Sequence, residues 1–151
     1  MPNKINIERI KQFVGEVKEA LHVLREYLPK GKEEILKNPT ILGSSKYHLI
    51  VAIQGCIDIC NHLVAKKGGR APEDYADCFN LMADLGILEN DLSERLAQMA
   101  RFRNLLIHLY WRVDNERVYK ILSENLVDID QFLGAVGRNL QRTINERSSH
   151  K

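Results

Sequence analysis

The sequence predicts an all-α protein, an antiparallel bundle of four to five helices. Apolar residues recur at helical spacing along most of the chain. No proline follows Pro72, so the second half contains no built-in helix breaker. No stretch keeps a strand-like alternation for long. At 151 residues the chain is long enough to bury a real core, and we expect a single domain over residues 1–151.

The first half of the chain predicts two long helices. The first helix places its apolar residues on one face, at Ile10, Phe13, Val14, Val17, Leu21, Leu24 and Leu28. Pro29 and Gly31 end it. The second helix begins at Pro39-Thr40. The run Lys66-Lys67-Gly68-Gly69 closes it, because cations suit the last turn of a helix and glycine suits the position beyond.

The second half predicts three further helical stretches. A short helix begins near Pro72 and stops near Gly86. Asp91 is expected to cap the next helix, which carries the apolar positions through Leu109. Asp114 marks a break or a new cap, and a last helical stretch runs from residue 116 to about residue 147.

The composition is that of an ordinary soluble globular protein. Hydrophobic residues make up 44% and charged residues 28%, which excludes a disordered tail, a collagen-like fibre and a disulfide-stapled mini-protein. The chain has 22 Lys and Arg against 20 Asp and Glu, for a formal net charge of +2. This balance excludes a protein that coats nucleic acid broadly by charge, but it allows RNA at one locally basic cleft.

We expect a cytoplasmic protein with no membrane contact. The N-terminal residues carry charges where a signal peptide needs its apolar run. The longest unbroken apolar run is Leu49 to Ile53, far short of the ~20 residues of a membrane-spanning helix. The three cysteines are odd in number and sparse, which favours a reducing compartment over a disulfide framework.

Residues 99 to 114 gather more donor-rich side chains than a solvated helix face needs. Treated as one helix at about 100° per residue, the segment sorts into three stripes. The apolar stripe should face the core and contains Phe102, Leu105, Leu109 and Val113. The two polar stripes flank it, one with Arg103, Ile107, Tyr110 and Asp114, the other with Arg101, Asn104, His108 and Trp111.

Arg103 and His108 form a candidate site for RNA cleavage. On one helix their spacing puts them roughly 140° apart and about 7.5 Å along the axis. They can still meet if the helix overwinds or ends there, or if a second copy of the helix supplies the missing wall. Histidine takes and gives protons near neutral pH, and arginine clamps a phosphate. The alternative is a pair of ordinary surface or interface residues.

Other candidate groups carry weaker signals. Asp58 and His62 are four residues apart and could pair, which is also what an ordinary helix ion pair does. Cys56 and Cys60 lack further ligands at a suitable spacing, so they are expected in the core. Only Glu19-Ala-Leu-His22 fits the Glu-x-x-His pattern, which rejects a di-metal bundle. We therefore expect no metal and no cofactor.

The segment Arg103-Asn-Leu-Leu-Ile-His108-Leu-Tyr110, followed by Asp114, resembles the R-x4-H-x-Y pattern of HepT-type toxins. These belong to the HEPN superfamily of helical ribonucleases and nucleotide-binding proteins. The resemblance covers roughly residues 5 to 135. It includes residues 57–63, residues 72–79 and the Leu85-Gly86-Ile87 turn. The R-x4-H spacing alone is weak, and the ordered set is fairly specific.

The resemblance implies an HEPN-like bundle that pairs into a homodimer and brings two copies of the motif to one cleft. It gives Arg103 and His108 the roles of the catalytic pair of a metal-independent endoribonuclease. The supporting candidates are Asn104, which would orient the site, Asp58 and His62, which would line the same cleft, and Arg101. Arg101 stands where many relatives carry a small residue, so it would strengthen RNA contact or alter how the helix enters the site.

The resemblance also implies a partner. Family members are usually paired with a minimal nucleotidyltransferase antitoxin, which transfers AMP units onto the motif tyrosine, Tyr110 here. The protein would then be the toxin of a type VII-like toxin–antitoxin module, with RNA as its substrate. AMP would add bulk and negative charge beside Arg103 and His108. The alternative is a non-catalytic helical module that binds a nucleotide or the nucleotidyltransferase without cutting RNA.

Overall fold

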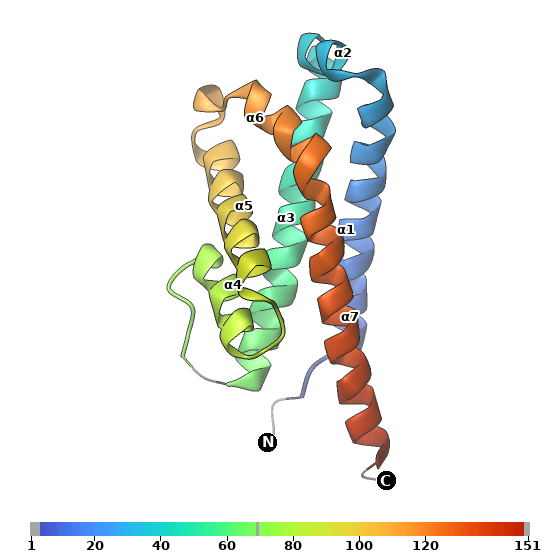
Figure 1. The fold of residues 1–151 in the computed structure, drawn as a ribbon, viewed down its shortest axis with the longest axis vertical. Helices are drawn as coiled ribbons and strands as arrows, with labels where there is room; N and C mark the ends of the chain where they lie inside the picture. Colours follow the sequence, from blue (N-terminus) through green and yellow to red (C-terminus); the bar gives the residue numbers. More distant parts are fainter. Residues whose placement is uncertain (1–3, 69, 150–151) are drawn as a thin grey trace.

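The computed structural model describes residues 4–68 and 70–149, and in these ranges it contains helices and no strand. The four long helices are α1 (Ile7–Tyr27), α3 (Pro39–Lys67), α5 (Asn90–His108) and α7 (Leu126–Ser149). They alternate in direction along the long axis of the molecule, so α1 begins and α7 ends at the same end of the bundle (Figure 1). The predicted all-α antiparallel bundle is confirmed.

Three shorter helices complete the fold. α2 (Lys32–Lys37) and α6 (Asn115–Lys120) cover the end of the bundle away from the termini, and α4 (Tyr75–Asp84) packs against α3 and α5 near the other end (Figure 1). A single buried side chain, Ile35, anchors α2. A π-type turn over Ile121–Asn125 joins α6 to α7.

The central helix, α3, directs buried residues toward several neighbouring helices. It contacts α1, α4, α5 and α7. By length and composition α3 could cross a membrane, since its most apolar 18-residue window has a mean hydropathy of 1.4. However, 56% of that window is buried against the rest of the protein. A core helix surrounded by other helices needs apolar residues all round, so burial accounts for its hydropathy.

The ends of α3 follow the sequence signals. Asn38 caps the N-terminus, where its side-chain oxygen accepts hydrogen bonds from the backbone N–H groups of Thr40 and Ile41. Gly68 follows Lys67 with a φ of 81°, which favours glycine. The predicted boundaries of this helix are therefore confirmed.

α1 and α3 approach each other closely at Gly55. A Cβ atom at this position would lie 2.3 Å from Cγ2 of the buried Val17. Glycine is therefore required for the two central helices to pack at this distance, because a valine side chain in the core has little freedom to move.

Three predicted helix features differ in the structure. Glu89, not Asp91, is the N-cap residue of α5, and Asp91 lies in the first turn. Residues 99–114 are not one helix, because α5 ends at His108 and a 3₁₀ turn over Tyr110–Arg112 follows. The last helical stretch is divided into α6, the π-type turn and α7. The predicted cap at Asp114 is confirmed, since its carboxylate accepts the N–H of Glu116.

Candidate functional site

The last turns of α5 present three of the predicted site residues to one open pocket. Arg103, Asn104 and His108 line it, and it has a volume of about 520 Å³. The remaining wall consists of Asp74 and Tyr75 at the start of α4, with Ile107. Arg103 and His108 thus reach one cavity although five positions separate them on the helix.

The guanidinium of Arg103 is held on several sides. Nη1 donates to Oδ1 of Asn104 at 2.8 Å, and Nη2 donates to Oε1 of Gln54 on α3 at 2.5 Å. Its Cζ lies 5.2 Å from the centre of the Tyr75 ring. Nε is buried and has no hydrogen-bond partner among the described residues. These contacts fix the direction of the side chain and leave donor capacity unused.

The amide of Gln54 is itself oriented by Asp58. Nε2 of Gln54 donates to Oδ1 of Asp58, one turn further along α3, at 2.8 Å. An ionised carboxylate only accepts hydrogen bonds, so the NH₂ group faces Asp58 and the oxygen faces Arg103. Gln54 therefore holds Arg103 without neutralising it. Gln54 is not among the site residues predicted from the sequence, where its only signal is the four-residue spacing to Asp58.

Asp58 and His62 do not form the expected pair. Asp58 bonds to Gln54, whereas Nε2 of His62 accepts the backbone N–H of Asn6 at 3.0 Å. Burial, followed by the nearby charges of Lys66 and Arg9, lowers the pKa of His62 below its ordinary value. His62 is not among the residues that line the pocket of Arg103. Asp58 contacts Arg103 only indirectly, through the hydrogen bonds of Gln54. His62 supports the start of α1.

The sequence predicts that Tyr110 shares a helical stripe with Arg103, and this prediction is wrong, because Tyr110 lies outside α5. It begins the 3₁₀ turn after α5 and is 50% exposed. Nζ of Lys46, a residue only 7% exposed, lies 4.3 Å from the centre of its ring. Because α5 stops at His108, Tyr110 packs over α3 and its ring covers a lysine.

Among the described residues, Arg101 and Arg103 are not paired with carboxylates. In the part of the chain that the structure describes, no acidic group lies within 4.0 Å of a charged nitrogen of Arg101 or Arg103. Arg101 is exposed on α5. The one carboxylate of the pocket wall, Asp74, accepts the N–H of Asp77 as the N-cap of α4.

A clamp on the preceding loop fixes the start of α4. Arg70 donates to both oxygens of Asp77, at 2.5 and 3.0 Å, and the N–H of Glu73 donates to the same carboxylate. The Arg70 guanidinium holds the pKa of Asp77 well below its usual range. The loop is therefore tied to the helix that carries Tyr75.

Cys56 and Cys60 pack in the core, as predicted, and Cys78 is buried beside Cys60. Cys56, Cys60 and Cys78 are all buried and free, and burial raises the pKa of the Cys56 and Cys60 thiols. Within residues 4–68 and 70–149, no three His, Cys, Asp or Glu side chains gather in a group that could hold a metal ion.

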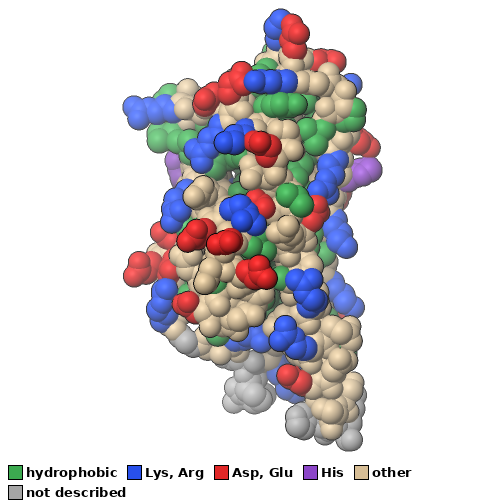
Figure 2. All heavy atoms as spheres, in the orientation of Figure 1, with side chains coloured by type: hydrophobic (Ala, Val, Ile, Leu, Met, Phe, Trp, Pro, Cys, Tyr) green, Lys and Arg blue, Asp and Glu red, His purple; other side chains and the backbone are tan. Residues whose placement is uncertain are grey.

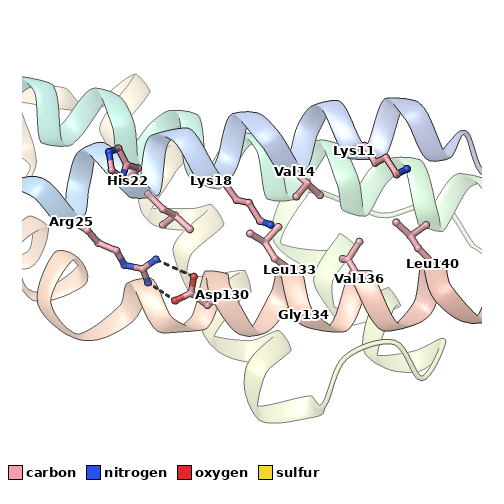
Figure 3. Close-up of a pocket in the computed structure, with 12 residues that line it drawn as sticks. Lys11, Val14, Lys18, His22, Arg25, Asp130, Leu133, Gly134, Val136 and Leu140 are labelled. Atoms are coloured by element: carbon pink, nitrogen blue, oxygen red, sulfur yellow. Dashed lines mark hydrogen bonds and ion pairs between the residues drawn. The ribbon is translucent and has the colours of Figure 1, made fainter.

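A second, larger groove lies between α1 and α7 and has a volume of about 680 Å³ (Figure 3). Apolar residues of both helices line it, and Arg25 pairs with Asp130 at one end (Figure 3). It contains none of the predicted site residues.

Solved structures with this arrangement of helices identify the fold. The fold matches the tri-AMPylated HEPN toxin of Shewanella oneidensis in complex with MNT antitoxin, with a TM-score of 0.80 and 23% identity, over 85% of this chain and 96% of the toxin. It also matches the cytosolic protein YutE of Bacillus subtilis, with a TM-score of 0.81 and 14% identity, over 95% of each chain. The fold is that of HEPN toxins.

Sequence comparison identifies the family. The family described as Ribonuclease HepT-like matches residues 17–136. An Archaeoglobus fulgidus protein, named as a candidate RNase, is 34% identical over 120 residues, which are 78% of this chain and 90% of the relative. The mRNA nuclease HepT of Shewanella oneidensis is 29% identical over 64% of this chain and 73% of its own length. The chain belongs to the HepT-like family of ribonucleases, which confirms the predicted family and enzyme class.

Proposed function

We propose that this protein is a metal-independent endoribonuclease and the toxin of a toxin–antitoxin module. One observation carries the proposal: Arg103, held in place by uncharged partners, lines the same open pocket as His108. A guanidinium that is fixed but not neutralised is suited to bind the scissile phosphate of RNA. The family membership supports the reaction class. The enzyme acts as a single domain over residues 1–151.

The reaction is an internal transfer within RNA. The 2′-hydroxyl attacks the adjacent phosphorus, and His108 accepts the hydroxyl proton. The bond to the 5′-oxygen breaks, and the protonated His108, acting as general acid, returns the proton to that oxygen. Arg103 stabilises the negative charge that develops on the phosphate oxygens. The products carry a 2′,3′-cyclic phosphate and a 5′-hydroxyl.

The supporting residues act on Arg103 or on RNA. Asn104 orients the guanidinium directly, and Asp58 does so by fixing the amide of Gln54. Arg101 adds an exposed cation on the same helix for contact with the RNA backbone. In a homodimer, two copies of the pocket face one cleft.

AMP transfer to Tyr110 silences the enzyme. The tyrosine is half-exposed, which gives a nucleotidyltransferase antitoxin access to its hydroxyl. The structurally similar toxin of Shewanella oneidensis is AMPylated and bound to MNT antitoxin, which supports the same partner class here. The added phosphate beside Lys46 and the α5 terminus blocks RNA by charge and bulk.

The decisive experiment is RNA cleavage by purified, unmodified protein in EDTA. We expect cleavage that leaves 2′,3′-cyclic phosphate ends and that His108→Ala abolishes. His22→Ala, at an exposed histidine on α1, is the matched control and should cut RNA at the normal rate. Cleavage that persists in His108→Ala would overturn the assignment. No cleavage, with tight binding of the nucleotidyltransferase, would favour a non-catalytic binding module.

A further inference from the structure

Tyr75 is an exposed aromatic residue whose position in the fold is tightly controlled. It is the first residue of α4, directly after the cap Asp74, and the Arg70–Asp77 clamp holds the loop before it. The residue is 40% exposed and lines the pocket of Arg103 and His108. Part of the Tyr75 side chain is therefore exposed to solvent where it lines the pocket.

The pocket combines a flat apolar surface with an anion-binding end. Tyr75 and Ile107, which is 41% exposed, supply apolar wall. Arg103, Asn104 and His108 supply hydrogen-bond donors. A volume of about 520 Å³ falls in the range that small-molecule and nucleotide-sized ligands occupy, about 300–1,000 Å³.

The two sides of the pocket carry opposite charges, Asp74 on the α4 side and Arg103 on the α5 side. Asp74 lies next to Tyr75, and its carboxylate disfavours a phosphate at that side. The guanidinium of Arg103 attracts the phosphate toward α5. The tyrosine side is therefore left for an uncharged planar group, and in a single-stranded nucleic acid that group is a base.

We propose that Tyr75 is the stacking site for the nucleobase adjoining the phosphate held by Arg103. This inference rests on the proposed function, since it takes the ligand to be RNA. The ring is supported by the Arg103 guanidinium, 5.2 Å from its centre, so one residue pair holds both parts of one nucleotide. Every base has a π-face, so stacking binds single-stranded RNA with little preference for sequence.

The test is binding of a labelled 2′-O-methyl oligoadenylate, followed by fluorescence anisotropy at fixed ionic strength. A second set of oligonucleotides carries one abasic position, moved stepwise along the chain. Stacking on one aromatic ring contributes about 1–3 kcal/mol, or roughly 5- to 150-fold in Kd. For the wild type, we expect one abasic position to weaken binding within this range. Tyr75→Ala should bind the complete oligonucleotide more weakly by a similar factor. Its Kd should no longer change when the abasic position is placed there.

Two further variants separate stacking from structural effects. Tyr75→Phe keeps the ring and should bind like the wild type. Leu85→Ala removes an equally exposed apolar side chain from the other end of α4 and should also bind normally. If Tyr75→Ala weakens the binding of every oligonucleotide by the same factor, including the abasic ones, the ring only supports Arg103 and the proposal is wrong. Unchanged binding by Tyr75→Ala, or no binding by the wild type, would also overturn it.

The result is independent of the nuclease assignment. A 2′-O-methyl group blocks the attacking oxygen, so the probe cannot be cut and binding is the only readout. Binding through Tyr75 by a protein that fails to cut RNA would refute the nuclease and leave the stacking site standing. Normal RNA cleavage by the wild type, together with unchanged oligonucleotide binding by Tyr75→Ala, would support the nuclease and refute the stacking site.

Discussion

The uncharged amide of Gln54 is the residue-scale feature on which the proposed site depends most. A carboxylate in its place would form an ion pair with Arg103 and lie beside Asp58, one turn away. The guanidinium would remain in position but lose its excess charge. A phosphate would then compete with an internal anion for the same donors.

Gln54→Glu is therefore expected to reduce RNA cleavage more than Gln54→Ala, which removes the hydrogen bond and keeps the arginine charged. Hydrogen bonds to charged groups contribute about 1.5–3 kcal/mol, so the alanine variant should lose on the order of 10- to 100-fold and the glutamate variant more. Initial cleavage rates measure both effects, and helical circular dichroism checks folding. A glutamate variant as active as wild type would show that Arg103 does not bind the phosphate.

Residue identity alone could not reveal this contact. Arg103 and His108 are visible in the sequence because their spacing belongs to a motif. A glutamine in an apolar helix carries no mark of the distant residue it will meet. Only the crossing of α3 and α5 brings the amide to the arginine, and local sequence patterns do not determine that crossing.

At the scale of elements, His62 makes the stability of the start of α1 depend on pH. Its Nε2 accepts the N–H of Asn6, and a protonated imidazole cannot accept. The folded-state pKa is lowered from the ordinary value of 6.5, so the unfolded chain binds more protons just below that pH. The stabilising contribution is therefore complete above pH 6.5 and is lost as pH falls from 6.5 through the lowered folded-state value.

We expect the free energy of unfolding of His62→Gln to fall less than that of wild type between pH 7.5 and 5. Glutamine keeps an acceptor oxygen and does not titrate. Urea unfolding at several pH values measures the difference. Parallel curves for the two proteins across this range would contradict the role given to His62.

The crossing of α1 and α3 gives a second element-scale prediction. Gly55→Ala should lower the free energy of unfolding by roughly 1–3 kcal/mol, because the new methyl group meets Val17. Gly43→Ala, in the same helix but with open space around the new methyl group, should be neutral or stabilising. In a double-mutant cycle, Val17→Ala should offset part of the Gly55→Ala loss, and strict additivity would contradict the predicted contact.

Helix ends were predictable from the sequence where capping residues, proline or glycine stand at the boundary. Asn38-Pro39 and Lys67-Gly68 delimit α3 in both sequence and structure. The end of α5 carries no such mark, since Leu109 is neither glycine nor proline. The chain leaves the helix there, and Tyr110 in the next turn places its ring over Lys46 of α3, a tertiary contact that local sequence does not show. α2 was missed because six residues with one buried side chain are too few for a periodic signal.

At the scale of the whole molecule, basic and acidic side chains are interspersed over the face shown in Figure 2. This distribution agrees with the net charge of +2. The proposed RNA substrate would therefore bind to a local group of cationic side chains. A two-fold dimer would place two sets of Arg101, Arg103 and His108 at one cleft. Dimerisation would therefore give one cleft twice as many cationic side chains as a single chain provides.

Sedimentation at micromolar protein concentration tests the dimer. We expect a single species of twice the chain mass of 17.4 kDa, and RNA cleavage that declines on dilution as the dimer dissociates. A monomer that cuts RNA with the same specific activity at every concentration would show that one copy of the pocket is sufficient.

The amide of Gln54 also has a genetic consequence. One base change, C to G at the first codon position, converts glutamine to glutamate, so the gene lies a single mutation from a protein whose arginine is neutralised internally. Under the proposed function, such a protein would lose its toxicity while keeping its fold. Selection for bacteria that survive the unrestrained toxin should therefore recover Gln54→Glu beside changes of Arg103 and His108, and sequencing the survivors would locate the residues on which toxicity depends.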